Sequence, residues 1–124
     1  MRYITLLTAT ATPEGPPPGE LMAAIAQLGQ KATEAGALLD FGGLAPSAAG
    51  ARVELTAGDI GVLDGPFTEA KELVSYAIYQ VASKEEAVEW ASRFLRVHSE
   101  QWPGYEGEIT VLKVLGPEDF GPPS

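Results

Sequence analysis

The chain has 124 residues, enough for one domain with a buried core, and its 17 acidic and 8 basic residues give a formal net charge of −9. That charge would repel phosphate backbones, so we expect no nucleic-acid partner. The chain has no cysteine and a single histidine, His98. This excludes disulfides, thiolate chemistry and multi-histidine metal sites, and we expect no metal, no cofactor and a cytoplasmic protein.

The N-terminal segment is predicted to be a strand. Residues 2–9, RYITLLTA, alternate in the way that is typical of a half-buried strand. A basic residue followed by an apolar run superficially resembles a signal peptide, but this run is short and is interrupted by Thr5 and Thr8. No other segment approaches the roughly 20 apolar residues of a membrane span, so we expect no membrane association.

The next predicted element is an amphipathic helix that begins at Glu20, after a proline-rich loop at residues 12–19. Its apolar positions recur with helical spacing at Leu21, Ile25, Leu28 and Ala32. Gly36 follows at the position where a glycine commonly ends a helix.

Two strand regions follow the helix. Residues 37–41, ALLDF, read as a strand that is closed by two glycines. Residues 52–56 and 60–64, RVELT and IGVLD, flank a short turn and predict a β-hairpin. Within it, Val53 and Leu55 alternate with polar residues, so we expect both to face inward.

The last third of the chain predicts a strand, a helix and a strand. Residues 73–82 are expected to form the longest strand, and Ser83 with Glu86 then matches a capping box that starts a helix. The apolar face of this helix runs from Ala87 to His98. Residues 108–115, EITVLKVL, form the final strand, so that residues 1–116 are one domain and residues 117–124 a loosely ordered tail.

This element order predicts an α+β fold. A βαββαβ order with a hairpin inserted after the first helix is the ferredoxin-like pattern, in which both helices cover one face of an antiparallel sheet. The strands at residues 73–82 and 108–115 are nevertheless apolar on both faces. Two helices cover only one face, so we expect a homodimer that packs sheet against sheet.

A family resemblance is carried by residues 62–94, VLDGPFTEAKELVSYAIYQVASKEEAVEWASRF. Asp64-Gly65-Pro66-Phe67, followed by Glu69, Lys71 and Glu72, resembles the signature of the YCII-related, or DGPF, family of small bacterial proteins. The resemblance covers most of residues 36–115.

The resemblance implies a dimeric α+β barrel. The wider superfamily includes cofactor-independent isomerases and monooxygenases and haem enzymes, and the DGPF branch has no settled activity to carry over. Members often occur beside extracytoplasmic-function sigma factors, which implies a regulatory alternative. YCII proteins proper resemble muconolactone isomerases and are suggested to use a histidine-aspartate pair, with the histidine after the first strand. Residues 9–19, which form that loop here, contain no histidine, so the pair cannot be carried over.

Asp64 and His98 are the candidate catalytic residues. Asp64 ends a strand, where its carboxylate can accept hydrogen bonds from turn amides; alternatively it is a general base at a pocket mouth beside Phe67, which would raise its pKa. His98 either caps the end of its helix or acts as the acid-base group, because it alone titrates near neutrality.

Other side chains are candidates for substrate binding. Lys71 either forms a local ion pair or anchors an anionic ligand. Tyr76 is either a core or dimer-interface residue or a residue that orients a polar substrate. Trp102 either packs over the edge of the barrel or covers a cavity. Asp40 faces solvent or is a second acid in the cavity.

Two functions are therefore expected to compete. One is a cofactor-independent enzyme that performs acid-base chemistry on a small metabolite. The other is a non-catalytic small-molecule-binding or regulatory module associated with sigma-factor-type transcription control. A purely structural dimer without a pocket is a third reading, because the fold does not determine the activity.

Overall fold

The computed structural model describes residues 1–68 and 71–121. In chain order its helices and strands are β1 (Arg2–Ala11), α1 (Gly19–Glu34), β2 (Leu38–Gly43), β3 (Ala51–Thr56), β4 (Asp59–Asp64), β5 (Leu73–Gln80), α2 (Lys84–Gln101) and β6 (Glu106–Val114). Two short 3₁₀ helices, η1 (Ser47–Ala49) and η2 (Pro117–Phe120), lie between β2 and β3 and after β6.

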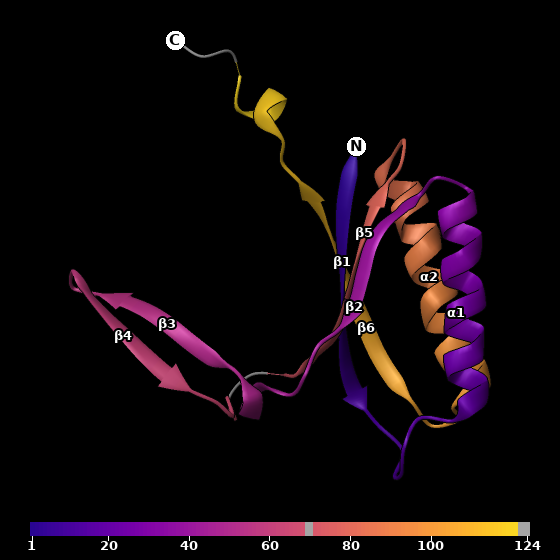
Figure 1. Cartoon of the computed structure of the whole chain (residues 1–124), viewed down its shortest axis with the longest axis horizontal. Coiled ribbons are helices and arrows are strands. Elements are labelled where there is room, and N and C mark those ends of the chain that lie inside the picture. Colours follow the sequence, from indigo (N-terminus) through magenta and orange to yellow (C-terminus); the bar gives the residue numbers. More distant parts are fainter. Residues whose placement is uncertain (69–70, 122–124) are drawn as a thin grey trace.

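Four strands form one antiparallel sheet in the order β2-β5-β1-β6, and both helices lie on one of its faces (Figure 1). Without the β3–β4 hairpin, the element order is βαββαβ, which is the ferredoxin-like arrangement. The predicted α+β fold is thereby confirmed. The sheet of a single chain is open and does not close into a barrel.

The helix-covered face of the sheet contains the core. Tyr3, Thr5 and Leu7 alternate along β1 and are all buried under the helices. Tyr79 of β5 lies beside them and stacks on Trp90 of α2, with ring centroids 6.3 Å apart. The alternation in residues 2–9 therefore correctly predicted a strand with one buried face.

The end of α1 and the start of α2 are both set by local hydrogen bonds. After α1, Gly36 adopts a φ of +73°, its amide donates to Thr33 and the Ala37 amide donates to Ala32, which is the Schellman arrangement. At the start of α2, the Glu86 amide donates to Ser83 Oγ at 3.2 Å. Glu86 Oε2 in turn accepts from the Ala82 amide at 2.8 Å, one residue earlier than in a standard capping box.

The second face of the sheet, here called the open face, is apolar and has no helix over it. Register with the buried residues of β1 places five aliphatic side chains on this face: Ile4, Leu6, Ile78, Leu112 and Val114. Leu112 is 51 % exposed, and the other four are half-buried by their neighbours in the sheet. The expectation of strands with two apolar faces is confirmed, whereas the partner that would cover the open face remains a prediction.

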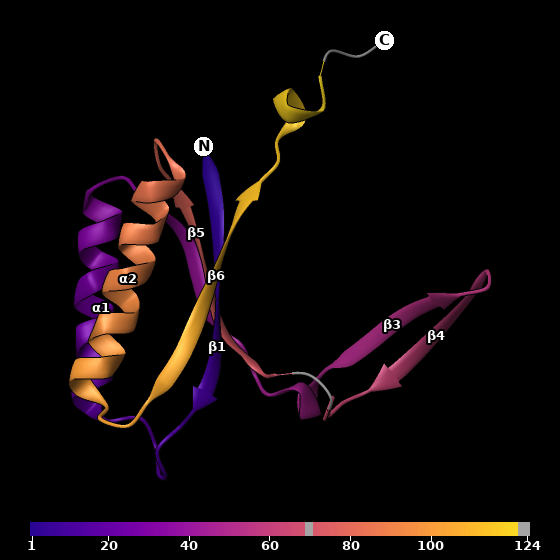
Figure 2. The ribbon, with the colours of Figure 1, turned by 180° about the vertical axis from the view of Figure 1, so that it is seen from behind.

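The β3–β4 hairpin, here called the arm (residues 51–64), differs from its expected position. It forms a separate two-stranded sheet and extends away from the body on the side opposite the helices (Figure 2). Val53 and Leu55 are 67 % and 70 % exposed, so the prediction that they face inward is wrong. Their alternation reflects an apolar face of the arm that no part of the described chain covers.

Two smaller expectations also change. The longest strand is β1, with 10 residues, because β5 ends at Gln80 and has 8. The first part of the tail is ordered by contacts: η2 places the Asp119 carboxylate against the Gly116 amide at 2.8 Å and the Lys113 ammonium at 3.0 Å. Residues 122–124 of the predicted tail lie outside the described residues.

Candidate functional site

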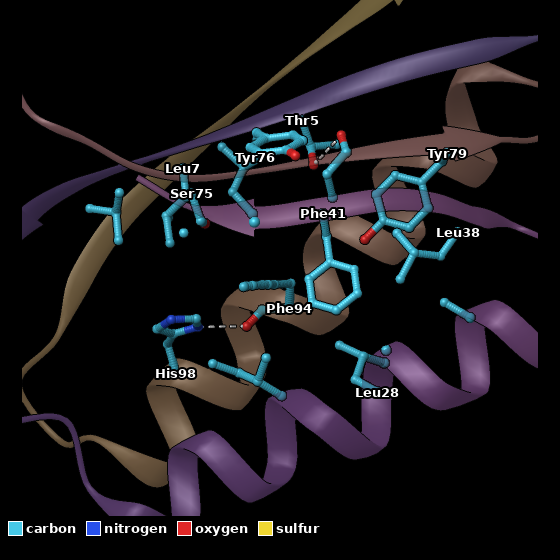
Figure 3. Close-up of a pocket in the computed structure, with 18 of the residues that line it drawn as sticks. Thr5, Leu7, Leu28, Leu38, Phe41, Ser75, Tyr76, Tyr79, Phe94 and His98 are labelled. Atoms are coloured by element: carbon cyan, nitrogen blue, oxygen red, sulfur yellow. Dashed lines mark hydrogen bonds between the residues drawn. The ribbon is translucent and has the colours of Figure 1, made fainter. Parts of the chain in front are cut away.

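A cavity of about 250 Å³ lies between the sheet and the two helices (Figure 3). Residues from all four strands of the large sheet and from both helices contribute to its wall. Much of this wall is aliphatic or aromatic, as at Leu7, Ile25, Leu28, Leu38, Phe94 and Ile109. The cavity exists because the helix-covered face of the sheet is not completely filled by side chains.

No Asp, Glu, Lys or Arg within the described residues lines the cavity. Its polar residues are Thr5, Ser75, Tyr76, Tyr79 and His98. Pairing with Leu6 places the Tyr76 side chain on the open face of the sheet. The Thr5 hydroxyl donates to the Ala77 carbonyl at 3.4 Å. Burying an unpaired charge is costly, so such a wall favours an uncharged ligand.

His98 carries the only imidazole among the described residues that line the cavity. It lies in the last turn of α2 and is 5 % exposed. Its ring stacks on Phe94, with centroids 4.8 Å apart, and contacts the tilted ring of Tyr105, with centroids 4.9 Å apart. Its Nδ1 lies 2.9 Å from the Phe94 carbonyl oxygen, as Figure 3 shows. A carbonyl only accepts hydrogen bonds, so Nδ1 carries a proton, and in the neutral form of the ring Nε2 is the hydrogen-bond acceptor.

Trp102 lies outside the cavity wall but belongs to the same aromatic stack. Its ring stacks on Tyr105 at 5.3 Å, and Tyr105 contacts the His98 ring. Burial raises the pKa of Tyr105, whose hydroxyl is buried with no partner among the described residues. Trp102 therefore supports the position of His98 through another ring and does not line the cavity.

Asp40 and Tyr76 form a hydrogen-bonded pair at the β2–β5 junction. The Tyr76 hydroxyl donates to Asp40 Oδ2 at 3.1 Å, and this bond is the main cause of the raised pKa of Tyr76. The second carboxylate oxygen of Asp40 accepts from the Phe41 amide at 2.8 Å. Tyr76 contributes to the cavity wall, whereas Asp40 is exposed and does not.

The other candidates lie outside the cavity. Asp64 is exposed at the end of β4, at the base of the arm, so the cavity that His98 lines does not include it. Phe67 lies below the Arg52 guanidinium, 4.2 Å from its ring centroid. Lys71 forms a 3.5 Å ion pair with Glu108 of β6, in which both side chains are mostly exposed. Glu69 lies outside the described residues.

The Asp-Gly-Pro-Phe corner is attached to η1, not closed upon itself. The Gly65 amide donates to the Gly50 carbonyl at 2.9 Å, and the Phe67 amide donates to Ser47 Oγ at 3.0 Å. These two amides therefore do not make the turn bonds to Asp64 that the sequence suggested. A side chain at residue 65 would overlap the Ser47 carbonyl oxygen, which explains the glycine.

Glu72 completes this attachment. Its carboxylate accepts hydrogen bonds from the Ser47 hydroxyl at 2.7 Å and from the Ser47 amide at 3.1 Å. Charged acceptors make the stronger hydrogen bonds in proteins, so Glu72 holds η1 against the start of β5. Ser47 had no distinguishing pattern around it in the sequence, since a serine in a loop of small residues is unremarkable.

Two further aromatic residues lie at the cavity, and sequence reasoning missed one of them, Phe41. Phe41 lies in its wall although 61 % exposed, and Tyr79 turns its hydroxyl toward it (Figure 3). Burial raises the pKa of Tyr79. Phe41 read as an ordinary strand residue in the sequence, because only the packing of α1 and α2 leaves space beside it.

No group of three or more Asp, Glu or His side chains within residues 1–68 and 71–121 is placed to hold a metal ion. Neither helix in this part of the chain has the length and hydropathy needed to cross a membrane.

In a comparison with known families, the model of the YCII-related domain matches residues 1–101. The match includes β1 and α1, which precede the residues 36–115 that carry the resemblance seen in the sequence, and it ends before Trp102. A search of the curated proteins found no match. Because residues 1–101 are most of the 124-residue chain, the protein belongs to the YCII-related domain family.

Proposed function

We propose that this protein binds a small, uncharged and mostly apolar molecule in the cavity between its helices and sheet. The observation that carries the proposal is the chemistry of the wall: apolar side chains with one buried imidazole, His98. A ligand site is commonly an apolar pocket with a few polar groups that fix orientation. At about 250 Å³ the cavity suits a small metabolite.

His98 Nε2 would accept a hydrogen bond from a hydroxyl or N–H group of the ligand. The opposite ring nitrogen is held by the Phe94 carbonyl at 2.9 Å, and the ring is fixed between Phe94 and Tyr105. A fixed acceptor in apolar surroundings rejects ligands that leave it unpaired. Specificity would therefore come from one donor group placed at His98.

The second candidate is an enzyme that transfers a proton through His98. The same imidazole favours it, because a neutral ring with a free Nε2 can act as a general base. Asp64 is at the arm and outside the cavity wall, so in this version His98 acts without it. A regulatory module would bind a ligand in the same cavity, and ligand binding would change its interaction with a protein partner. The family resemblance implies that such regulation would act on transcription through a sigma factor.

We also propose that the working form is a cytoplasmic homodimer. The apolar open face, with Leu112 51 % exposed, supports a second copy over the sheet, and the absence of cysteine from the chain fits a reducing compartment.

A thermal-shift screen of uncharged metabolites tests the binding proposal. A ligand at 100 times its Kd stabilises the native state by about 2.7 kcal/mol. We expect His98→Phe to lose most of this shift and His98→Gln, which keeps an acceptor near the Nε2 position, to retain part of it. Asp64→Asn should keep the full shift.

The opposite pattern, with loss of the shift in Asp64→Asn and retention in His98→Phe, would overturn the cavity assignment. For any ligand found, product formation that is abolished in His98→Phe would distinguish the enzyme from the binding module. A pH-rate profile with one ionisation that disappears in His98→Gln would assign the proton transfer to the imidazole.

A further inference from the structure

The arm has one apolar face and one polar face. Cross-strand pairing places Val53 opposite Val62 and Leu55 opposite Ile60, so that these four side chains share one face. All four are 67–70 % exposed. The other face carries Arg52, Glu54, Thr56, Asp59 and Leu63. The arm therefore has the two-sided pattern of a hairpin that packs on something, yet its apolar face is bare in a single chain.

The base of the arm is held in place by specific bonds. Gly65 donates to Gly50, the Phe67 amide donates to Ser47, and Glu72 accepts two hydrogen bonds from Ser47. The arm makes no extensive contact with another helix or strand within the described residues. An isolated two-stranded hairpin is marginally stable in water, so an arm held out from the body needs a surface to pack on.

The position of the arm indicates which surface this is. It projects from the side of the sheet that the helices leave uncovered, so whatever covers the open face lies next to the arm (Figures 1 and 2). The open face is itself apolar, with Leu112 51 % exposed. A second copy of the chain has both surfaces and can cover both at once by twofold symmetry.

Simple dimensions support the same arrangement. Strands of six residues at about 3.3 Å per residue make the arm about 20 Å long, whereas packed sheets lie about 10 Å apart. An arm of that length passes the edge of a facing sheet and reaches along the flank of the second copy. A stable interface buries about 800 Å² on each partner, more than four aliphatic side chains provide, so the arm and the open face have to be covered together.

Charge also favours an uncharged contact between copies. Each chain has a formal net charge of −9, so two copies repel each other electrostatically. A contact between them is therefore best made by surfaces that carry no charge. The four residues Val53, Leu55, Ile60 and Val62 form such a surface, and the one charged side chain on the same face, Asp64, lies at the base of the arm opposite Ala51.

We propose that the arm packs the face formed by Val53, Leu55, Ile60 and Val62 against the flank of a second copy of the chain, and so clamps the dimer. This deepens the proposed homodimer and rests on it, but it is independent of the ligand. In this proposal, the Asp-Gly-Pro-Phe corner holds the arm in the direction of the second copy.

Sedimentation velocity over a dilution series tests the clamp with two double variants. Leu55→Lys with Val62→Lys adds two charges to the apolar face. Thr56→Lys with Leu63→Lys adds the same charges to the same two strands on the polar face. We expect the first pair to raise the dimer dissociation constant at least tenfold and the second to change it less than threefold. Far-UV circular dichroism should show the same fold in both.

Hydrogen exchange gives a second measurement on the wild-type chain. Amides of residues 51–64 should exchange more slowly at concentrations where the dimer forms than below its dissociation constant. A wild-type chain that stays monomeric at micromolar concentration would overturn the dimer and the clamp together. A dimer that both double variants leave equally intact, with unchanged exchange in the arm, would overturn the clamp alone.

Discussion

β1 and β3 have the same alternating pattern and opposite surroundings. Tyr3, Thr5 and Leu7 of β1 are at most 7 % exposed because α1 and α2 lie over them. Val53 and Leu55 of β3 have the same period of two but are 67 % and 70 % exposed. Alternation thus tells which residues share a face of a strand, and only the tertiary structure tells whether that face is covered.

The largest expected effect is a difference in the free energy of unfolding between two truncations, one under the helices and one in the arm. Leu21 of α1 is 2 % exposed, so Leu21→Ala should lower the free energy of unfolding by about 2–5 kcal/mol. Leu55→Ala in the arm should change it by no more than about 0.5 kcal/mol for the monomer. Urea unfolding at protein concentrations below the dimer dissociation constant measures both. Equal losses in the two variants would mean that the arm packs within its own chain.

The junction between the two regions is tested by adding a methyl group. In Gly65→Ala the new Cβ overlaps the Ser47 carbonyl oxygen, so we expect a loss of about 1–3 kcal/mol in the free energy of unfolding. Gly61→Ala, in the middle of β4, has nothing within 4 Å of the added Cβ and serves as the matched control. Chemical denaturation compares the two, and a harmless Gly65→Ala would contradict the close approach of the corner to η1.

A double-mutant cycle on Ser47 and Glu72 has a smaller expected effect. Ser47→Ala removes the hydroxyl that donates to Glu72 and accepts from the Phe67 amide, and Glu72→Gln removes the charge. We expect a coupling energy of about 1 kcal/mol, because both groups are near the surface. Additive losses in the cycle would show that the two residues act independently. Faster amide exchange at Phe67 in both single variants would locate the effect at the arm base.

The smallest effect is expected at the end of the chain. Hydrogen bonds to its carboxylate lower the pKa of Asp119; the bond from the Gly116 amide has the larger effect and the bond from the Lys113 ammonium the smaller one. Because the folded-state pKa is lowered, the stabilisation is present above the ordinary carboxyl pKa of about 4 and is lost as pH falls through the lower folded value. Asp119→Asn should therefore speed amide exchange at Gly116 at pH 7, with little change in the overall unfolding midpoint. If the protection factor of the Gly116 amide, which corrects for the intrinsic pH dependence of exchange, is the same in the wild type at pH 7 and at acidic pH, the bond to Asp119 does not order η2.

The candidate site could be predicted from the sequence only in part. His98 could be identified because it is the only histidine, and helical spacing from Phe94 placed it on the apolar side of α2. The cavity around it was not predictable, because it depends on how α1 and α2 fit against β1, β2 and β5. Asp64 drew attention because it begins a recognisable motif, and the structure places that motif at the base of the arm.

The sequence alone determined the elements and their order, because helix caps, glycines and apolar spacing act over a few residues. Ser83 with Glu86 started α2 and Gly36 ended α1 through hydrogen bonds between near neighbours. The tertiary structure decided the direction of the arm, the attachment of Gly65 to η1 and the cavity beside His98. Each depends on contacts between residues distant in the chain, such as Ser47 with Glu72, whose approach follows from packing and not from local spacing.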